Sequence, residues 1–166
     1  MRNTVIALAA VAALAACASR PEPTPTPTPT TTTPPVSQPS GPTAGSAEDF
    51  RVSVGDRVFF GYDRFDLTPE ARSLLERQAA WLGRYPNVRV LVAGNADERG
   101  TREYNLSLGA RRAAAAKDYL VSLGVAANRL ETVSYGKERP LDARSNEEAW
   151  SVNRNAHTQI VSGAVS

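Results

Sequence analysis

The stretch NVRVLVAGNADERGTREYNLSLGARRAAAAKDYL, residues 87–120, joins a valine-rich run to a charged segment and then to a run of helix-favouring residues. The apolar run over 87–94 is closed by a glycine and predicts a β-strand. Residues 103–123 are followed by Gly124 and predict a helix that ends there. A strand followed directly by a helix is the repeating unit of α/β domains.

The same unit occurs on both sides of this stretch. Residues 56–63 are rich in β-favouring side chains, and 67–86 predict a helix with Thr68 as N-cap and Pro69 in the first helical position. Three further elements are expected: a strand over 128–136, a short helix over 145–154 that begins at Ser145 or Asn146, and a strand over 156–162. The order β-α-β-α-β-α-β predicts an α/β fold with helices packed on a small, largely or partly parallel sheet.

Composition limits the kinds of protein that this chain can be. Nineteen Lys and Arg against seventeen Asp and Glu give a net charge of +2, which is too small for a general nucleic-acid or anionic-lipid surface. The only cysteine is Cys17 and the only histidine is His157, so an intramolecular disulfide and a Cys/His metal centre are excluded. We expect no metal and no cofactor.

Residues 1–16 have the pattern of an export signal. A positive charge at Arg2 precedes an apolar run that is shorter than the roughly 20 residues of a membrane-spanning helix. The run ends in Leu-Ala-Ala-Cys17, which resembles the bacterial lipobox. That resemblance implies a diacylglyceryl group on Cys17, cleavage before it, and acylation of the new amino terminus, typically with palmitate. An ordinary secretion signal with a chance cysteine is the alternative.

The residue after Cys17 bears on the destination. It is Ala18, and the aspartate that resembles an inner-membrane retention signal is absent there. We therefore expect an outer-membrane lipoprotein whose domain faces the periplasm.

Residues 17–47 predict a lipidated cysteine followed by a disordered tether. Nine of the twelve prolines lie here among many threonines, with too few apolar side chains to form a core. Polyproline II geometry gives such a segment a maximum reach of roughly 90 Å. A proline-rich ligand for another protein module is the rival interpretation. The folded domain is expected over 48–162.

The charged segment contains the candidate site. Asp97 follows the carboxyl end of a strand, where open α/β sheets favour ligand sites. At 100° per residue, Arg112 falls on a flank of the following helix together with Asn105, whereas Arg111 falls on the polar side. The apolar face is predicted to hold Leu106, Ala110, Ala113, Leu120 and Val121. An arginine on a partly apolar flank requires a partner.

Two interpretations of Asp97 and Arg112 follow from spacing. They pair with each other as a structural salt bridge, or they are held apart to receive an ammonium and a carboxylate, as in an amino-acid zwitterion. The neighbouring Glu98, Arg99, Arg102 and Glu103 are expected to form a solvated, locally paired surface.

With VSYGKERP (133–140) and VNRNA (152–156), the charged stretch resembles the OmpA-like peptidoglycan-binding domain, and more narrowly that of the lipoproteins of the Tol-Pal system. The resemblance covers residues 56–161. It implies a mixed four-stranded sheet with helices on one side, a meso-diaminopimelate stem peptide of peptidoglycan as ligand, and Tol proteins, TolB and TolA, as partners.

The resemblance also assigns residues. The family's ligand-holding aspartate and arginine, fifteen residues apart, fall on Asp97 and Arg112, which favours the zwitterion site over the salt bridge. The other binding residues that it implies are Asn105, Thr101, Phe60, Gly61 and Arg154.

Three positions depart from the family pattern. Asn95 stands where the family often has histidine, Gly61 follows Phe60 where an aspartate is common, and Asn155 replaces an arginine. An asparagine cannot titrate near neutral pH, and a glycine cannot supply a carboxylate contact.

The leading hypothesis is a non-catalytic lipoprotein that binds peptidoglycan and couples the outer membrane to the cell wall within the Tol-Pal system, for envelope integrity and for constriction during division. An OmpA-like envelope lipoprotein without Tol partners is one alternative, and a peptidoglycan hydrolase that uses Asp97 and Glu98 as paired carboxylates is another. For Asp97→Ala and Arg112→Ala we expect stability changes within about 1 kcal/mol, as at surface positions.

Overall fold

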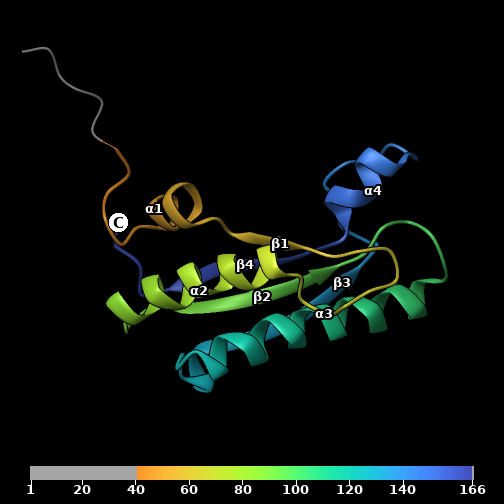
Figure 1. Cartoon of the computed structure of the whole chain (residues 1–166). Helices are drawn as coiled ribbons and strands as arrows, with labels where there is room; N and C mark the ends of the chain where they lie inside the picture. Colours follow the sequence, from red (N-terminus) through yellow and green to blue (C-terminus); the bar gives the residue numbers. More distant parts are fainter. Residues whose placement is uncertain (1–40, 166) are drawn as a thin grey trace, which may run out of the picture. The chain divides into compact units, whose positions relative to one another are not determined.

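The computed structural model describes residues 41–165, so the predicted signal peptide, Cys17 and most of the tether lie outside the described residues. Four strands form one sheet in the order β1-β4-β2-β3 (Figure 1). Their bounds are β1 Arg57–Phe59, β2 Arg89–Asn95, β3 Leu130–Gly136 and β4 Asn155–Ser162. β2 and β3 run parallel, whereas β4 is antiparallel to both β1 and β2. The predicted α/β fold with a mixed four-stranded sheet is confirmed.

Two long helices, α2 (Pro69–Arg84) and α3 (Arg102–Ser122), cover one face of this sheet (Figure 1). The predicted start of α2 is confirmed, because the Thr68 hydroxyl oxygen accepts a hydrogen bond from the backbone N–H of Ala71 at 3.2 Å. None of the helices within residues 41–165 is long and apolar enough to cross a membrane.

A short helix, α4 (Glu147–Asn153), lies between β3 and β4 in the chain. Of the two predicted caps, Asn146 is the one used: its side chain accepts from the backbone N–H of Ala149 at 2.9 Å. α4 ends directly before β4, so this helix lies beyond the same end of the sheet as the loop between β2 and α3 (Figure 1).

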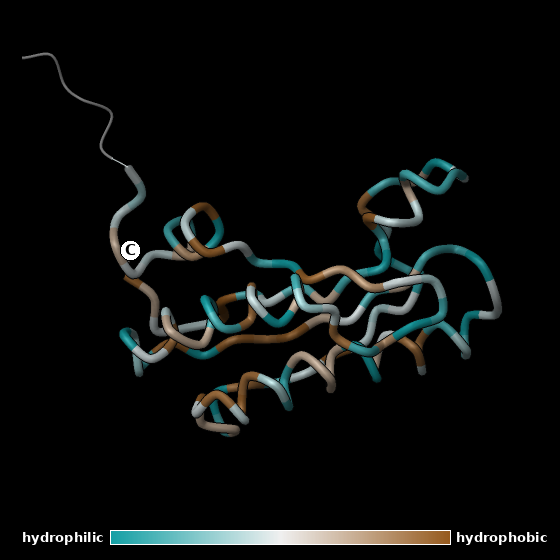
Figure 2. Tube along the Cα trace, in the orientation of Figure 1, coloured by the Kyte–Doolittle hydropathy of each residue, from teal (hydrophilic) through white to brown (hydrophobic). Residues whose placement is uncertain are grey.

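The core lies between the sheet and the two long helices. On β2, Val90 and Val92 face the helices and are fully buried, and β2 forms a continuous apolar stretch in Figure 2. The helices supply the largest buried side chains, among them Trp81, Leu75 and Leu120. Each such side chain contributes about 1.5–3 kcal/mol by leaving water.

One folded segment has no counterpart among the predicted elements. A helical turn, α1 (Ala47–Asp49), continues into a π-helical turn, η1 (Phe50–Val54), so helical structure begins one residue before the predicted boundary at 48. The Phe50 ring packs edge-on against Trp81 with 5.0 Å between ring centroids. The backbone N–H of Val165 donates to the carbonyl of Gly45 at 3.0 Å, so the two ends of the described chain meet here.

α3 lies directly on the end of β2 because two glycines meet. A Cβ atom on Gly94 would lie 1.8 Å from the carbonyl oxygen of Gly109, so only glycine fits at this crossing. Gly100, by contrast, is needed for its backbone φ of +92° in the loop before α3.

The predicted apolar face of α3 was wrong by roughly a quarter turn, as helix geometry gives it. Ala110 and Val121 are exposed, and Arg112 lies in the middle of the buried face. The buried residues are Asn105, Leu108, Gly109, Arg112, Ala113, Ala116 and Leu120. The close crossing at Gly109 turns the small side chains toward the sheet, which the ranking of side chains by hydrophobicity could not anticipate.

Candidate functional site

A cavity of about 230 Å³ opens at the carboxyl end of β2. Three segments enclose it: the loop after β1, the loop from β2 to α3, and the first turns of α3. Its lining residues are Tyr62, Asp63, Ala96, Asp97, Arg99, Gly100, Tyr104, Asn105, Leu108 and Arg112. The position agrees with the strand end at which a ligand site was expected.

Asp97 is a buried anion in the wall of this cavity, with 5% of its side chain exposed. Its Oδ1 accepts from the backbone N–H of Arg99 at 3.1 Å and from Nε of Arg99 at 3.2 Å. Its Oδ2 accepts from Nη2 of Arg99 at 2.6 Å and from Nη1 of Arg154 at 3.4 Å. Burial alone raises the pKa of Asp97, but the hydrogen bonds and charge of Arg99 outweigh it and hold the pKa below its ordinary value.

Arg112 is a buried cation in the same cavity, and its partners are backbone carbonyls. Its Nε donates to Arg64 at 2.8 Å, Nη1 to Asn95 at 2.8 Å, and Nη2 to Gly61 at 3.1 Å. Burial lowers its pKa to about 10, so it stays charged at neutral pH. Among the ion pairs of residues 41–165 there is none between Asp97 and Arg112. One N–H on each terminal nitrogen therefore remains for a bidentate partner.

The loop after β1 supplies two cavity residues that were not among the predicted site residues. The strand predicted over 56–63 ends at Phe59, so the chain leaves the sheet early and Tyr62 and Asp63 enter the cavity wall. Asp63 adopts a φ of +54° and accepts a hydrogen bond from the Tyr104 hydroxyl, which raises the pKa of Tyr104. A carboxylate thus reaches the cavity from Asp63, although Gly61 has none.

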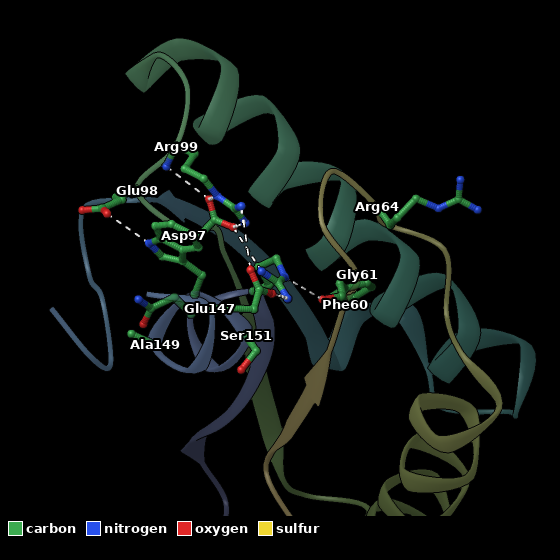
Figure 3. A network of polar contacts seen from close by, with 12 residues as sticks. Phe60, Gly61, Arg64, Asp97, Glu98, Arg99, Glu147, Ala149 and Ser151 are labelled. Carbon is green, nitrogen blue, oxygen red and sulfur yellow. Dashed lines mark hydrogen bonds and ion pairs between the residues drawn. The ribbon is translucent and has the colours of Figure 1, made fainter. Parts of the chain in front are cut away.

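Arg99 was expected on a solvated surface, and the structure corrects this. Its guanidinium carbon lies 4.1 Å from the ring centroids of both Tyr62 and Trp150, and its Nη1 is 3.8 Å from Glu147 on α4. Figure 3 shows Arg99 and Asp97 turned toward each other beside α4. Two aromatic faces around a cation are a favourable arrangement.

The two other charged neighbours, Glu98 and Arg102, differ in their surroundings. Glu98 accepts from Nε1 of Trp150 at 3.0 Å (Figure 3), and hydrogen bonds from Ser145 and Trp150 lower its pKa. Arg102 is exposed, as predicted, but it pairs at 3.2 Å with Glu138, which lies outside the charged segment.

Two of the predicted binding residues lie at the start of α3. Asn105 lines the cavity, and its Nδ2 donates to the carbonyl of Arg99 at 2.9 Å. Thr101 is exposed outside the cavity lining and caps α3, accepting from the backbone N–H of Tyr104 at 3.2 Å. Asn105 thus helps to hold the Arg99 loop, whereas Thr101 fixes the first turn of the helix.

The remaining predicted residues, Phe60, Gly61 and Arg154, stand behind the cavity. The Phe60 ring lies 5.2 Å from the guanidinium carbon of Arg112, and the Gly61 carbonyl accepts from that arginine. Arg154 is buried, with Nε donating to the Phe60 carbonyl at 3.1 Å and Nη2 to Glu147 at 2.7 Å. These residues hold the two charged groups of the cavity in place.

Two of the three departures from the family pattern touch each other. Nδ2 of Asn95 donates to Oδ1 of Asn155 at 2.9 Å, and both side chains are buried. Nδ2 of Asn155 in turn donates to the carbonyl of Val152 at 2.8 Å. Neither asparagine lines the cavity, so their side chains join the end of β2 to α4 instead.

The chemistry of the cavity suits binding. Buried acceptors and a buried guanidinium face one space, which fits a ligand that carries both charges. The pKa values of Asp97 and Glu98 both lie below their ordinary range, which is the opposite of what a general acid at neutral pH needs. Within residues 41–165 no three His, Cys, Asp or Glu side chains gather as a metal site.

Residues 59–154 match the model of a family described as the OmpA family. A peptidoglycan-associated lipoprotein from Rhizobium meliloti is 55% identical over 122 residues, which cover 74% of this chain and 69% of that protein. A peptidoglycan-associated lipoprotein from Mesorhizobium japonicum is 57% identical over 122 residues, which cover 74% of this chain and 72% of that protein.

Solved structures agree with these relatives. The crystal structure of the peptidoglycan-associated lipoprotein from Burkholderia pseudomallei superposes with a TM-score of 0.62 at 39% identity, over 64% of this chain and 90% of that one. The C-terminal domain of Helicobacter pylori MotB superposes with a TM-score of 0.61 at 23% identity, over 64% and 84%. The second likeness concerns the fold alone.

Proposed function

Because this chain belongs to the OmpA family, we propose that its folded unit binds the peptide stem of peptidoglycan through a diamino acid of the meso-diaminopimelate type. One observation carries the proposal: Asp97 and Arg112 line one cavity, are oppositely charged, and are each held by partners other than the other. An amino-acid zwitterion at the end of a stem side chain presents the two complementary charges together.

The ligand would lie across the cavity in one orientation. Its carboxylate would take the two remaining N–H groups of Arg112, and its ammonium would approach Asp97, with Asp63 in the lining as a second acceptor. The aliphatic part would pass over Leu108, which together with Ala96 forms the buried apolar part of the lining. Charge-assisted hydrogen bonds of this kind are roughly twice as strong as hydrogen bonds between neutral groups.

The amino-terminal sequence suits an anchor for this binding unit. A lipid on Cys17 would hold the chain in the outer membrane, and the Pro/Thr-rich tether would span up to roughly 90 Å toward the cell wall. We expect the protein to link the outer membrane to peptidoglycan as part of the Tol-Pal system, with TolB and TolA as partners, and to support envelope integrity and outer-membrane constriction. The names of its relatives as lipoproteins support the anchored form.

Sedimentation with purified peptidoglycan tests the binding. The full chain should sediment with it, and Asp97→Asn, which keeps the shape but removes the charge, should stay in the supernatant. Arg102→Gln is the matched control because Arg102 forms an exposed pair outside the cavity. Equal sedimentation of all three proteins would contradict the proposal. Release of soluble muropeptides by the purified protein would instead favour the alternative of a peptidoglycan hydrolase.

Affinity purification from detergent-solubilised envelopes tests the Tol assignment. Recovery of TolB with the wild-type protein would support it. Peptidoglycan binding without any Tol protein would favour the alternative of an OmpA-like lipoprotein that acts alone.

A further inference from the structure

We propose that the side chain of Arg99 occupies the ligand site in the free protein. Its guanidinium is bonded to Asp97 and must be displaced by the ammonium group of the ligand. The inference rests on the proposed function, because the displacing group is the ammonium of the diamino acid. It assigns Arg99 a regulatory role, a latch that lowers affinity until the correct ligand enters.

The first observation is that Asp97 has no acceptor capacity to spare. Each of its two oxygens accepts two hydrogen bonds. Of these four bonds, three come from Arg99 and one from Arg154, and the shortest is the 2.6 Å bond from Nη2 of Arg99. A carboxylate offers about four acceptor positions. A ligand ammonium can therefore reach Asp97 only if the side chain of Arg99 moves.

The second observation is that Arg99 has another carboxylate within reach. Its Nη1 lies 3.8 Å from Oε2 of Glu147, which is exposed on α4, while Asp97 is buried. The rings of Tyr62 and Trp150 flank the guanidinium on this path. A short swing would carry Arg99 from Asp97 to Glu147 without losing its aromatic neighbours, so the displaced cation keeps a counter-ion.

The third observation separates Arg99 from Arg154, the other cation on Asp97. Arg154 is buried and also bonds to Phe60 and Glu147, so it is fixed in the fold. Arg99 is 30% exposed and bonds through its side chain only to carboxylates. Arg99 is therefore the cation that can leave, and Arg154 is the one that stays.

While the Arg99 side chain occupies the site, every ligand that needs Asp97 binds more weakly. Each affinity is reduced by the same factor, which is the fraction of free protein in which the site is open. Removing this side chain should tighten binding without changing the preference among ligands. A residue that contacts the ligand would have the opposite effect, because its loss would weaken binding. This difference makes the proposal testable.

The experiment titrates the full chain in detergent with L-Ala-γ-D-Glu-meso-diaminopimelate and with the corresponding L-Lys tripeptide, by calorimetry. Wild type, Arg99→Gln and the control Arg102→Gln are compared. If the site is closed in about nine-tenths of the free protein, Arg99→Gln should lower the Kd for the diaminopimelate peptide about tenfold, with the preference over the lysine peptide unchanged. Arg102→Gln should bind like the wild type.

NMR of the same proteins adds a readout that needs no ligand. The Nε–H signal of Arg99 should be protected from exchange in the free wild type and lose this protection in Asp97→Asn and on peptide addition. The indole N–H of Trp150, which bonds to Glu98, should shift on peptide addition, whereas that of Trp81, which bonds to Asp49, should not.

The possible results distinguish the role of Arg99 from the proposed function. If wild type binds and Arg99→Gln binds equally or more weakly, the latch is overturned and the proposed function stands. An unprotected Arg99 Nε–H in the free protein also overturns the latch. If neither wild type nor Arg99→Gln binds the diaminopimelate peptide, the proposed function fails, and the latch fails with it.

Discussion

Nη1 of Arg112 donates to the backbone carbonyl of Asn95 at 2.8 Å, and this bond ties the middle of α3 to the last residue of β2. The same guanidinium holds the carbonyls of Gly61 and Arg64 in the loop after β1. Arg112 therefore organises the three segments that enclose the cavity, in addition to lining it. It cannot be treated as a surface residue.

Arg112→Ala should consequently unfold more easily than the sequence suggests. Its side chain is fully buried, and its loss leaves three carbonyls without their donor. We expect a loss of at least about 3 kcal/mol in unfolding free energy, where the sequence had suggested about 1 kcal/mol. Urea denaturation measures this, and Arg111→Ala is the control because Arg111 is exposed beside it. Equal stability of the two variants would contradict the role given to Arg112.

Gly94→Ala should disturb both the fold and the site. The added methyl group would lie 1.8 Å from the Gly109 carbonyl oxygen, so α3 must move away from β2. We expect a loss of about 1–3 kcal/mol and weaker binding of the diaminopimelate peptide.

Gly83→Ala is the matched control for this substitution. Gly83 lies within α2 and a Cβ there meets nothing within 4 Å. The added methyl group should raise the unfolding free energy by roughly 0.5–1 kcal/mol, because alanine favours a helix more than glycine does. A Gly94→Ala protein as stable as Gly83→Ala would show that the glycine crossing is not needed.

Asn95 and Asn155 should behave as a coupled pair. Each single alanine variant removes the 2.9 Å hydrogen bond and leaves a buried polar group, at a cost of about 1–3 kcal/mol. The double variant should cost less than the sum of the two, with a coupling energy of about 0.5–3 kcal/mol from a double-mutant cycle. Additive losses would mean that the two side chains act independently.

His157 should make stability depend on pH. Burial and the nearby charge of Arg57 lower its pKa from 6.5, against the opposing effect of Asp56. A histidine whose pKa is lower in the folded state binds its proton more readily when unfolded. Its contribution is therefore complete above pH 6.5 and is lost as the pH falls through the lowered value. Urea midpoints between pH 7.5 and about 5 should fall more steeply for wild type than for His157→Gln.

Much of the fold is readable from local signals. Thr68 and Pro69 predict the start of α2, and Gly124 predicts the end of α3, because capping and backbone conformation depend on neighbours in the chain. Asp97 was placed correctly at the end of a strand. Arg112 was distinguished from Arg111 by helix phase, although the phase itself was off.

What could not be read depends on contacts between distant segments. The aromatic run VFFGY looks like strand throughout, yet β1 ends at Phe59 because the next residues bond to Arg112 and Arg154 instead of to β4. Tyr62 and Asp63 were missed for this reason. Arg99 was missed because Trp150, which covers it, lies on α4, far away in sequence.

The meeting of Gly45 and Val165 places the attachment point of the tether beside the start of β2, whereas the candidate site lies at the end of that strand. Under the proposed function, lipid and peptidoglycan would pull at these two places, and the load would enter the sheet through β1, which follows the tether in the chain, and run along β1 and its antiparallel partner β4. The ladder hydrogen bonds between these antiparallel strands are perpendicular to that line. They would then be loaded together in shear and not one after another. If the proposed anchoring holds, the sheet would therefore carry tension between the two attachment points along the length of its strands.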